Sequence, residues 1–248
     1  MNRRTRMPGS PDSRADRGPS TVASAAQNRQ ETRGPRIDRR TALLAGLGAL
    51  AAVGGGAAWA TNGPTITYPE GTYGSTGPRV LVAYDSQYGS TGDIATAIGQ
   101  VLAADARVDV RHISNVTSFQ PYSATVLGAP VQTDRWRRSA LEFLGDHSSE
   151  VAGMPFALFL ASMSYGLDPD PQRQDAQKAP LLAEAAARVP GADPVSTKAF
   201  GGFVDFARMT PANAAVYRLV AGDPRPGDYR DFPGIRRWAA SIAPALLR

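Results

Sequence analysis

The sequence predicts an α/β fold with a doubly wound parallel sheet of five strands, and three observations lead to this prediction. Apolar runs of strand length alternate with segments whose apolar residues recur at helical spacing, from Arg79 to the C-terminus. Several runs end in short polar or glycine-containing stretches, where ligands bind in such sheets. The chain of 248 residues, 42% of them hydrophobic, is long enough to bury a substantial core.

The strand predictions follow from the pattern of apolar residues. The run RVLVAY is continuously apolar after its arginine, which is typical of a buried strand, whereas ARVDVRHI alternates as an edge or half-buried strand does. Gly128 and Pro130 are expected to end a third, short buried strand. The predicted strands are residues 79–84, 106–113, 123–130, 155–162 and 196–206.

Helical spacing predicts the connections between these strands. Ile94, Ile98 and Leu102 lie on one face of the first predicted helix. Residues 207–230 form an insertion before the last helix and contain a short amphipathic pattern. The predicted helices are residues 91–104, 136–147, 175–188 and 231–247.

The N-terminal part is expected to lie outside the folded domain. Residues 1–36 are rich in Arg, Ser, Pro and Gly and are predicted to be disordered. Residues 61–78 are rich in Gly, Pro, Thr and Tyr and are predicted to be an extended linker. The folded domain is therefore expected to span residues 79–248.

Residues 37–60 resemble a twin-arginine export signal. Arg39 and Arg40 precede an uncharged, Ala- and Gly-rich stretch that ends on the small-x-small sequence at 58–60. Its length would also let residues 41–60 span a bilayer if the segment is not cleaved. The alternative is a buried Ala-rich helix. The expectation is an extracytoplasmic protein, either exported or anchored in the membrane.

The charge distribution argues against nucleic-acid binding by the folded part. The formal net charge is +5, but residues 1–60 hold ten arginines and four acidic residues, which leaves 17 basic and 18 acidic residues in the remainder. The domain is thus nearly neutral. Cysteine is absent, which excludes disulfides, thiolate catalysis and iron–sulfur clusters. His112 and His147 are too far apart for a local metal pair, and we predict no metal.

The stretch YDSQYGST, residues 84–91, is the first candidate site. It leads from the first strand directly into a helix N-terminus, where free backbone amides and the helix dipole favour an anion. Ser86, Ser90 and Thr91 offer hydroxyl groups, and Gly89 lets the backbone approach a ligand. No lysine follows, so this is not a phosphate loop of the nucleotide triphosphatases. An ordinary helix cap at Ser90 or Thr91 is the alternative.

The sequence VLVAYDSQYGST resembles the phosphate-binding signature of the flavodoxin family. Two further strand ends, GAPVQTDRW and ASMSYG, are similar to the loops that flank the flavin ring, with Tyr165 as a stacking aromatic. The resemblance implies a flavodoxin-like sheet with strand order 2-1-3-4-5 and flavin mononucleotide (FMN) as cofactor. The residues expected to hold FMN are Ser86, Gln87, Tyr88, Gly89, Ser90, Thr91, Ala129, Pro130, Val131, Gln132, Trp136, Ser162, Met163, Ser164, Tyr165 and Gly166.

Two features depart from the family pattern. Asp85 places an acid inside the phosphate turn, which costs binding energy unless its side chain points to solvent or to an arginine. No aromatic residue follows Pro130 directly. The cluster of Arg135, Arg137 and Arg138 either steers an acidic partner or is a solvated helix face.

The resemblance is nearest to the menaquinone-dependent protoporphyrinogen oxidase-like members, which implies an FMN-dependent oxidoreductase that passes electrons to a quinone or a redox-partner protein. In those members a region comparable to residues 207–230 lies near the flavin edge, so the insertion is either a substrate cover or a packing segment. The alternatives are a non-enzymatic, exported or tethered electron carrier and a flavin-free binding module. No catalytic residue is identified.

Overall fold

The computed structural model describes residues 66–132, 135–163, 165, 170–221 and 226–248. The strands are β1 (Gly71–Tyr73), β2 (Arg79–Tyr84), β3 (Arg107–His112), β4 (Ala124–Gln132), β5 (Arg135–Trp136), β6 (Phe156–Ser162), β7 (Ser196–Gly201), β8 (Phe203–Val204) and β9 (Gly227–Asp228). The α-helices are α3 (Ser90–Leu102), α4 (Arg138–Asp146), α5 (Ser148–Ala152), α7 (Pro171–Ala186), α8 (Pro211–Ala221) and α9 (Phe232–Leu246). Two short 3-10 helices, η1 (Ile113–Asn115) and η2 (Phe206–Arg208), complete the described elements.

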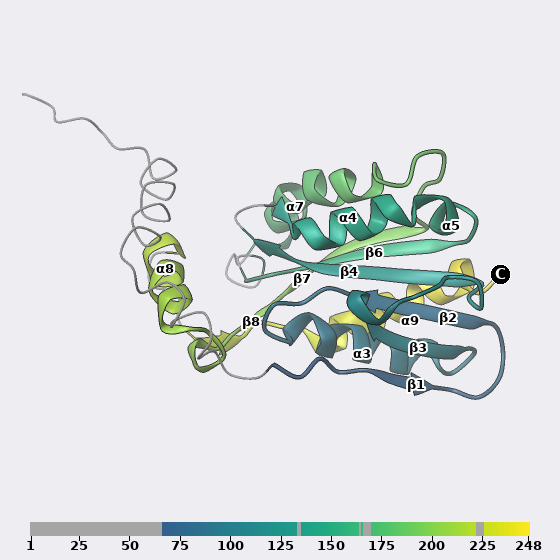
Figure 1. The fold of residues 1–248 in the computed structure, drawn as a ribbon, viewed down its shortest axis with the longest axis horizontal. Coiled ribbons are helices and arrows are strands. Elements are labelled where there is room, and N and C mark those ends of the chain that lie inside the picture. Colours follow the sequence, from purple (N-terminus) through teal and green to yellow (C-terminus); the bar gives the residue numbers. More distant parts are fainter. Residues whose placement is uncertain (1–65, 133–134, 164, 166–169, 222–225) are drawn as a thin grey trace, which may run out of the picture. The chain divides into compact units, whose positions relative to one another are not determined.

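The central sheet has the strand order β1-β3-β2-β4-β6-β7 (Figure 1). All neighbours from β3 to β7 are parallel; Val82, for example, lies opposite Val110 on one side and Val126 on the other. Since β2, β3, β4, β6 and β7 are the five predicted strands in chain order, the predicted order 2-1-3-4-5 is confirmed.

A short strand covers the outer edge of β3. Residues Gly71–Tyr73, inside the segment expected to be a linker, form β1 and pair antiparallel with β3. Thr72 lies opposite Asp109 and donates a hydrogen bond of 2.5 Å to its carboxylate. Asp109, the polar residue between the apolar Val108 and Val110 of β3, therefore helps to join β1 to the sheet.

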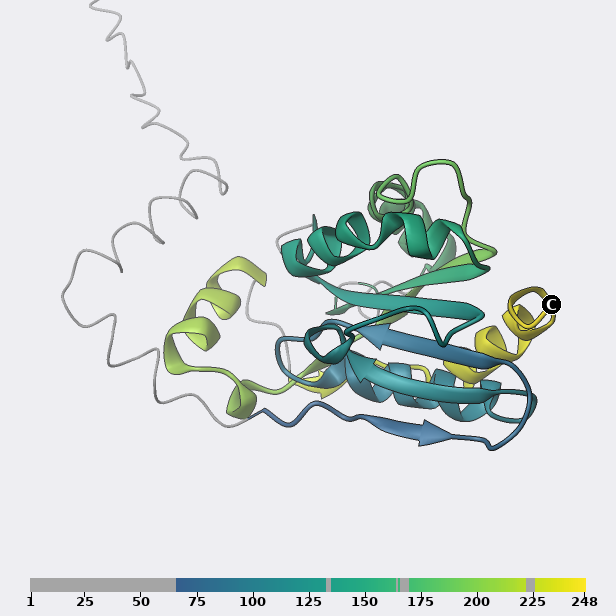
Figure 2. The ribbon, with the colours of Figure 1, turned by 45° about the vertical axis from the view of Figure 1, so that its right-hand side comes forward.

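Helices cover both faces of the sheet (Figures 1 and 2). On one face α3 and α9 bury a core that includes Val82, Ile98 and Ile235. On the other face α4 and α7 pack over a second core that includes Leu81, Leu144 and Leu160. The continuous apolar run of β2 follows from this burial on both faces.

The segment after the third predicted strand differs from the prediction. β4 does not end at Pro130 but continues to Gln132, where it forms a hairpin with β5. The carbonyl of Pro130 accepts a bond of 3.2 Å from the amide of Arg137. Trp136 was predicted to begin a helix, but it lies in β5 and α4 begins at Arg138.

The fifth predicted strand leaves the sheet at its end. β7 ends at Gly201, and residues Phe203–Val204 form β8, which pairs with β9 instead. A Cβ atom on Gly201 would lie only 1.9 Å from the carbonyl oxygen of Tyr229, so only glycine allows this crossing. The insertion between β8 and β9 contains α8, the amphipathic helix that the pattern indicated.

The N-terminal tail and the segment 37–60 lie outside the described residues. Within the described part of the chain, no helix combines the length and apolarity that crossing a membrane requires.

Candidate functional site

Three loops follow the C-terminal ends of the central strands. We refer to residues 85–91 as loop 1, residues 128–137 as loop 2 and residues 161–166 as loop 3. Loops 1 and 2 are neighbours because Tyr84 pairs with Gly128, and loops 2 and 3 are neighbours because Pro130 pairs with Ala161. The parallel sheet therefore brings together the three segments that the sequence predicted as one site.

Loop 1 forms a tight turn into α3. Gly89 adopts a left-handed conformation with φ of 88°, which favours glycine, and its amide donates a bond of 2.9 Å to Oγ of Ser86. Gly89 is also the N-cap of α3, and no side chain caps the helix. The alternative of an ordinary cap at Ser90 or Thr91 is therefore not what the structure has. The first amides of α3 lack a side-chain acceptor.

Thr91 is fully buried, and its hydroxyl makes no hydrogen bond. Buried hydroxyl groups are bonded in most proteins, so such a group indicates a missing partner. Among the described residues, the buried side-chain polar atoms without a hydrogen bond belong to Thr91, Thr96, His112, Trp136 and Arg137. All of these except Thr96 lie in or beside loops 1 and 2. Unsatisfied polar groups thus collect at the predicted site.

The donors of loop 1 fit a phosphate ester. The uncapped N-terminus of a 13-residue helix, the hydroxyl of Thr91 and the close backbone approach at Gly89 supply neutral donors and a favourable dipole. Ser86 braces the turn from inside, because its Oγ is already used by the Gly89 amide. The phosphate group of FMN therefore fits loop 1, with Ser86 as a support rather than a direct ligand.

The insertion supplies residues that the sequence did not point to. Nη1 of Arg208 donates to the carbonyl of Tyr88 at 3.2 Å, and Nδ2 of Asn213 donates to the hydroxyl of Tyr88 at 3.2 Å. A cation thus stands beside loop 1 although none occurs in the loop itself. These residues are more than a hundred positions from loop 1 in the chain, and only their place after the fifth strand hinted at their location.

Asp85 does not point to solvent. Its side chain is buried, with 2% exposed, and Oδ1 lies 3.4 Å from Nη1 of Arg137 and 3.6 Å from Nε2 of His112. Ser139 donates a hydrogen bond to the other carboxylate oxygen. Burial would raise the pKa of Asp85, but the contacts with His112 and Ser139 and the charge of Arg137 lower it below its ordinary value. The acid in the phosphate turn is therefore charged and compensated.

Loop 2 is a hairpin rather than an open loop. Val131 pairs with Trp136, and Trp136 is 3% exposed and packs into the core under α4. Ala129 is buried in the same core, whereas Val131 is half-buried and Gln132 forms the end of β4. The arginine cluster divides, because Arg137 turns toward Asp85 while Arg138 forms an exposed pair with Glu142 at 2.7 Å.

The side chains of Met163 and Tyr165 in loop 3 contact different parts of the domain. Met163 packs with the insertion, where the hydroxyl of Tyr217 donates to its sulfur. The hydroxyl of Tyr165 donates a bond of 2.8 Å to Asp175 at the start of α7. Burial and the neighbouring Asp175 raise the pKa of Tyr165, so the phenol stays protonated. Ser162 is buried at the end of β6, and Ser164 and Gly166 lie outside the described residues.

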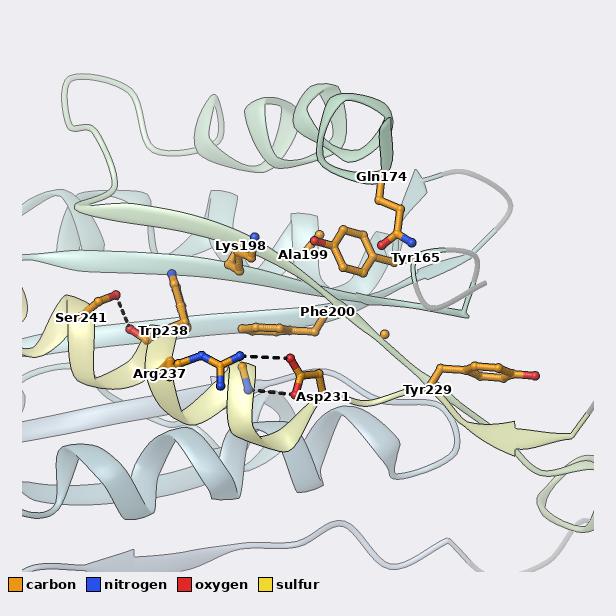
Figure 3. Close-up of a pocket in the computed structure, with 12 residues that line it drawn as sticks. Tyr165, Gln174, Lys198, Ala199, Phe200, Tyr229, Asp231, Arg237, Trp238 and Ser241 are labelled. Atoms are coloured by element: carbon orange, nitrogen blue, oxygen red, sulfur yellow. Dashed lines mark hydrogen bonds and ion pairs between the residues drawn. The ribbon is translucent and has the colours of Figure 1, made fainter. Parts of the chain in front are cut away.

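Tyr165 lines a cavity of about 650 Å³ along β7, between α7 and α9 (Figure 3). The rings of Phe200 and Trp238 lie in this cavity, and Lys198 and Arg237 stand on opposite sides of it. Two strands, β4 and β6, separate β7 from β2, which carries loop 1. In this structure Tyr165 therefore lines a cavity along β7, and no residue of loop 1 lines that cavity.

The histidines have separate environments. His147 contacts the rings of Phe119 and Phe143 and forms a pair with Glu150 at 3.3 Å, which is a structural arrangement. His112 instead joins the Asp85 cluster. In the part of the chain that the structure describes, no group of three or more His, Asp or Glu residues is placed to hold a metal ion.

Comparison with solved structures finds distant likenesses. The metal-soaked flavodiiron core from Synechocystis sp. PCC6803 is 13% identical, with 69% of this chain and 36% of that chain covered and a TM-score of 0.44. This chain therefore spans about a third of that protein. A mutant flavodoxin from Pseudomonas aeruginosa is 13% identical over 68% of this chain and 98% of its own, with a TM-score of 0.42. Oxidised flavodoxin 1 from Bacillus cereus is 17% identical over 59% and 99%, with a TM-score of 0.39.

A search of curated proteins finds no match. The sequence comparison with protein families is more decisive. Residues 81–222 match the flavodoxin domain, and this range is more than half of the 248-residue chain. It includes all three loops and α8. The chain therefore belongs to the flavodoxin domain family.

Proposed function

We propose that this chain binds FMN and transfers electrons. The observation that carries the proposal is the buried, unbonded hydroxyl of Thr91 at the uncapped N-terminus of α3, where an anion would complete the hydrogen bonding. Membership of the flavodoxin domain family supports the same cofactor. Bound FMN would supply the one- and two-electron chemistry, while the protein supplies position and electrostatics.

The residues of loop 1 would hold the phosphate. The backbone from Gln87 to Thr91 and the hydroxyls of Ser90 and Thr91 are the proposed donors, with Ser86 and Gly89 shaping the turn. The ring would lie between loops 2 and 3. There the proposed contacts are Ala129, Pro130, Val131, Gln132, Trp136, Ser162, Met163, Ser164 and Gly166, and Tyr165 would join them only by turning away from the cavity along β7.

Purification of the full-length protein tests this proposal directly. We expect a yellow protein whose visible spectrum shows bound flavin, and release of FMN on denaturation. Apoprotein titrated with FMN should recover the spectrum. A protein that is colourless and stays colourless in excess FMN would favour the flavin-free binding module instead.

The hydroxyl of Thr91 can be tested separately. Thr91→Val keeps the shape but removes the donor, so FMN binding should weaken by about 0.5–1.5 kcal/mol, which is roughly two- to twelvefold in Kd. The unliganded protein should be equally stable or more stable, because an unsatisfied buried hydroxyl is gone. Thr96→Val is the matched control, since Thr96 has the same kind of unbonded hydroxyl in the same helix. Equal Kd values for both variants would remove Thr91 from the site.

A second candidate function, an oxidoreductase that uses a quinone, is favoured by the position of α8. Through Asn213 and Tyr217 the helix contacts Tyr88 of loop 1 and Met163 of loop 3. A cover at this place would shield the flavin edge from a large protein and leave room for a small organic molecule. A pure electron carrier would instead need an open edge for docking a redox-partner protein.

Turnover separates these two functions. The FMN-loaded protein is mixed with a menaquinone analogue and a reduced organic donor such as protoporphyrinogen, and quinone reduction is followed. Steady turnover supports the oxidoreductase. Electron exchange with small redox proteins but not with the quinone supports the carrier.

We also propose that the protein works outside the cytoplasm, with residues 37–60 as a twin-arginine signal or as an anchor through residues 41–60. The paired arginines and the uncharged stretch support this proposal. Under it, residues 1–36 are a disordered tail, and the part of residues 61–78 that precedes β1 connects the segment to the domain. Replacing Arg39 and Arg40 with lysines should retain the protein in the cytoplasm, and fractionation of the cells measures this. Unchanged location would contradict the proposal.

A further inference from the structure

The carboxylate of Asp85 connects loop 1 to loop 2. The Asp85 amide donates a bond of 2.9 Å to the carbonyl of Gly128, where loop 2 begins. The side chain reaches the other end of the same loop, because Arg137 lies 3.4 Å from Oδ1 and Ser139 donates to Oδ2. One residue of loop 1 therefore contacts both ends of loop 2.

The side-chain contacts of Asp85 lie where loop 2 joins α4. Arg137 is the N-cap residue of α4, and its amide donates to the carbonyl of Pro130. Ser139 lies in the first turn of the same helix, whose N-terminus has no side-chain cap of its own. The carboxylate of Asp85 thus faces the positive end of α4 and helps to set where the hairpin of loop 2 returns to the helix.

His112 completes the surroundings of Asp85. Its Nδ1 accepts a bond of 3.3 Å from the amide of Ser114, which leaves the hydrogen of a neutral ring on Nε2, directed at Asp85. The ring of Tyr68 stacks on the imidazole with centroids 4.3 Å apart. The charged and titratable groups that face the carboxylate are thus His112 and Arg137.

The lengths of these contacts indicate positioning more than tight binding. Nη1 of Arg137 and Nε2 of His112 approach Asp85 at 3.4 and 3.6 Å but form no hydrogen bond. Charge-assisted hydrogen bonds are shorter, at about 2.7–2.9 Å. The attraction still orients the two side chains, and a shift of loop 1 would change both distances.

We propose that Asp85 is a positioning residue that couples loop 1 to loop 2, so that an anion held in loop 1 strengthens binding of the flavin ring beside loop 2. The inference rests on the proposed FMN function. Its physical basis is that an anion would fix the turn at Gly89, and the turn would carry Asp85, Arg137 and the start of α4 into one arrangement. The β4–β5 pairing of loop 2 would then already be held in this arrangement when the ring arrives.

The two halves of FMN, used as separate ligands, test this coupling in the full-length apoprotein. Riboflavin supplies the ring, and inorganic phosphate supplies the anion. Riboflavin binding is followed by fluorescence quenching with and without phosphate, with chloride to match the ionic strength. We expect phosphate to tighten riboflavin binding about fivefold, at the lower end of usual coupling between sites.

Asp85→Asn keeps the size of the side chain and removes its charge, so phosphate should no longer change the Kd for riboflavin. Ser139→Ala removes only the hydrogen bond and should reduce the effect in part. Asp109→Asn is the matched control. Asp109 is an equally buried aspartate, but it pairs with Leu81 inside β2 and not with a loop residue. This variant should keep the full effect of phosphate on riboflavin binding.

The outcomes distinguish the two proposals. An equal phosphate effect in the unchanged protein and in Asp85→Asn would overturn the coupling and leave FMN binding intact. So would tight FMN binding with no phosphate effect in the unchanged protein. Failure of FMN and riboflavin to bind under any condition would overturn the proposed function itself.

Discussion

Two buried aspartates, one in β3 and one in the loop that follows the neighbouring strand β2, have different surroundings. Asp109, in the middle of β3, is 1% exposed, and Asp85, at the end of β2, is 2% exposed. For both, burial raises the pKa while hydrogen bonds and nearby cations lower it, with a net shift below the ordinary value. The two differ in how completely their oxygens are bonded.

Asp109 has a full set of close partners. It accepts hydrogen bonds from Thr72 at 2.5 Å, from Nε of Arg79 at 2.8 Å and from Tyr122 at 3.1 Å. Arg79 also approaches through Nη2 at 2.6 Å, and Arg111 lies at 3.3 Å. These partners come from β1, β2, β3 and the segment before β4, so one carboxylate joins four parts of the sheet edge.

Asp85 has one hydrogen-bonding side chain, Ser139, and two further neighbours at longer distance, the guanidinium of Arg137 and the imidazole of His112. The comparison teaches that burial alone does not identify a functional acid. A buried carboxylate whose oxygens are all bonded stabilises the fold, whereas one surrounded by unsatisfied donors beside a helix N-terminus is a candidate for a ligand site.

The largest expected effect is on Asp109. Asp109→Ala leaves the hydroxyls of Thr72 and Tyr122 and the guanidinium of Arg79 without their acceptor, so the free energy of unfolding should fall by about 3 kcal/mol. Urea denaturation measures this. FMN binding by the folded fraction should not change. A smaller loss in the free energy of unfolding than that of Asp85→Asn would contradict the distinction between the two aspartates.

Acid should remove the contribution of both aspartates. Their pKa values are lower in the folded state, so their stabilisation is complete above the ordinary aspartate pKa of about 3.9 and is lost as the pH falls through the lower folded values. Stability should therefore decline below about pH 4. Denaturation from pH 2 to pH 6 should show a flatter profile for Asp109→Ala than for the unchanged protein. Parallel profiles would contradict the assignment.

The smallest expected effect on stability belongs to Asp85. Asp85→Asn still offers an acceptor to Ser139, and the partners that lose the charge stand at 3.4 and 3.6 Å, so the free energy of unfolding should fall by only about 1 kcal/mol. Urea denaturation of the apoprotein measures it. A loss as large as that of Asp109→Ala would make Asp85 a structural residue.

The sequence predicted the strands well because their signal is local. RVLVAY and PFALFLAS are continuous apolar runs, and the structure buries β2 and β6 on both faces. Short elements were missed for the same reason. β1, β5 and β9 have only two or three residues each, too few to show a period, and tertiary pairing holds them. The residues of β8 were predicted as the end of the fifth strand.

The candidate site was predictable where its parts follow strands and not where they come from elsewhere. Ser86, Gly89 and Thr91 were found because a turn into a helix has a recognisable sequence. The partners of Asp85 depend on how β3 and the start of α4 pack, and no spacing encodes that. Arg208 and Asn213 reach Tyr88 only because the start of the insertion lies beside loop 1.

The pairing of β8 with β9 has a wider consequence for the architecture. Phe203 pairs with Asp228 and Val204 with Gly227, so the segment between β8 and β9 begins and ends at neighbouring positions. The residues between β8 and β9 can therefore differ in number or sequence without changing how the central strands are connected. Because α8 belongs to this segment and contacts Tyr88 and Met163, a change there would alter the surroundings of loops 1 and 3 and leave the order of the central strands as it is.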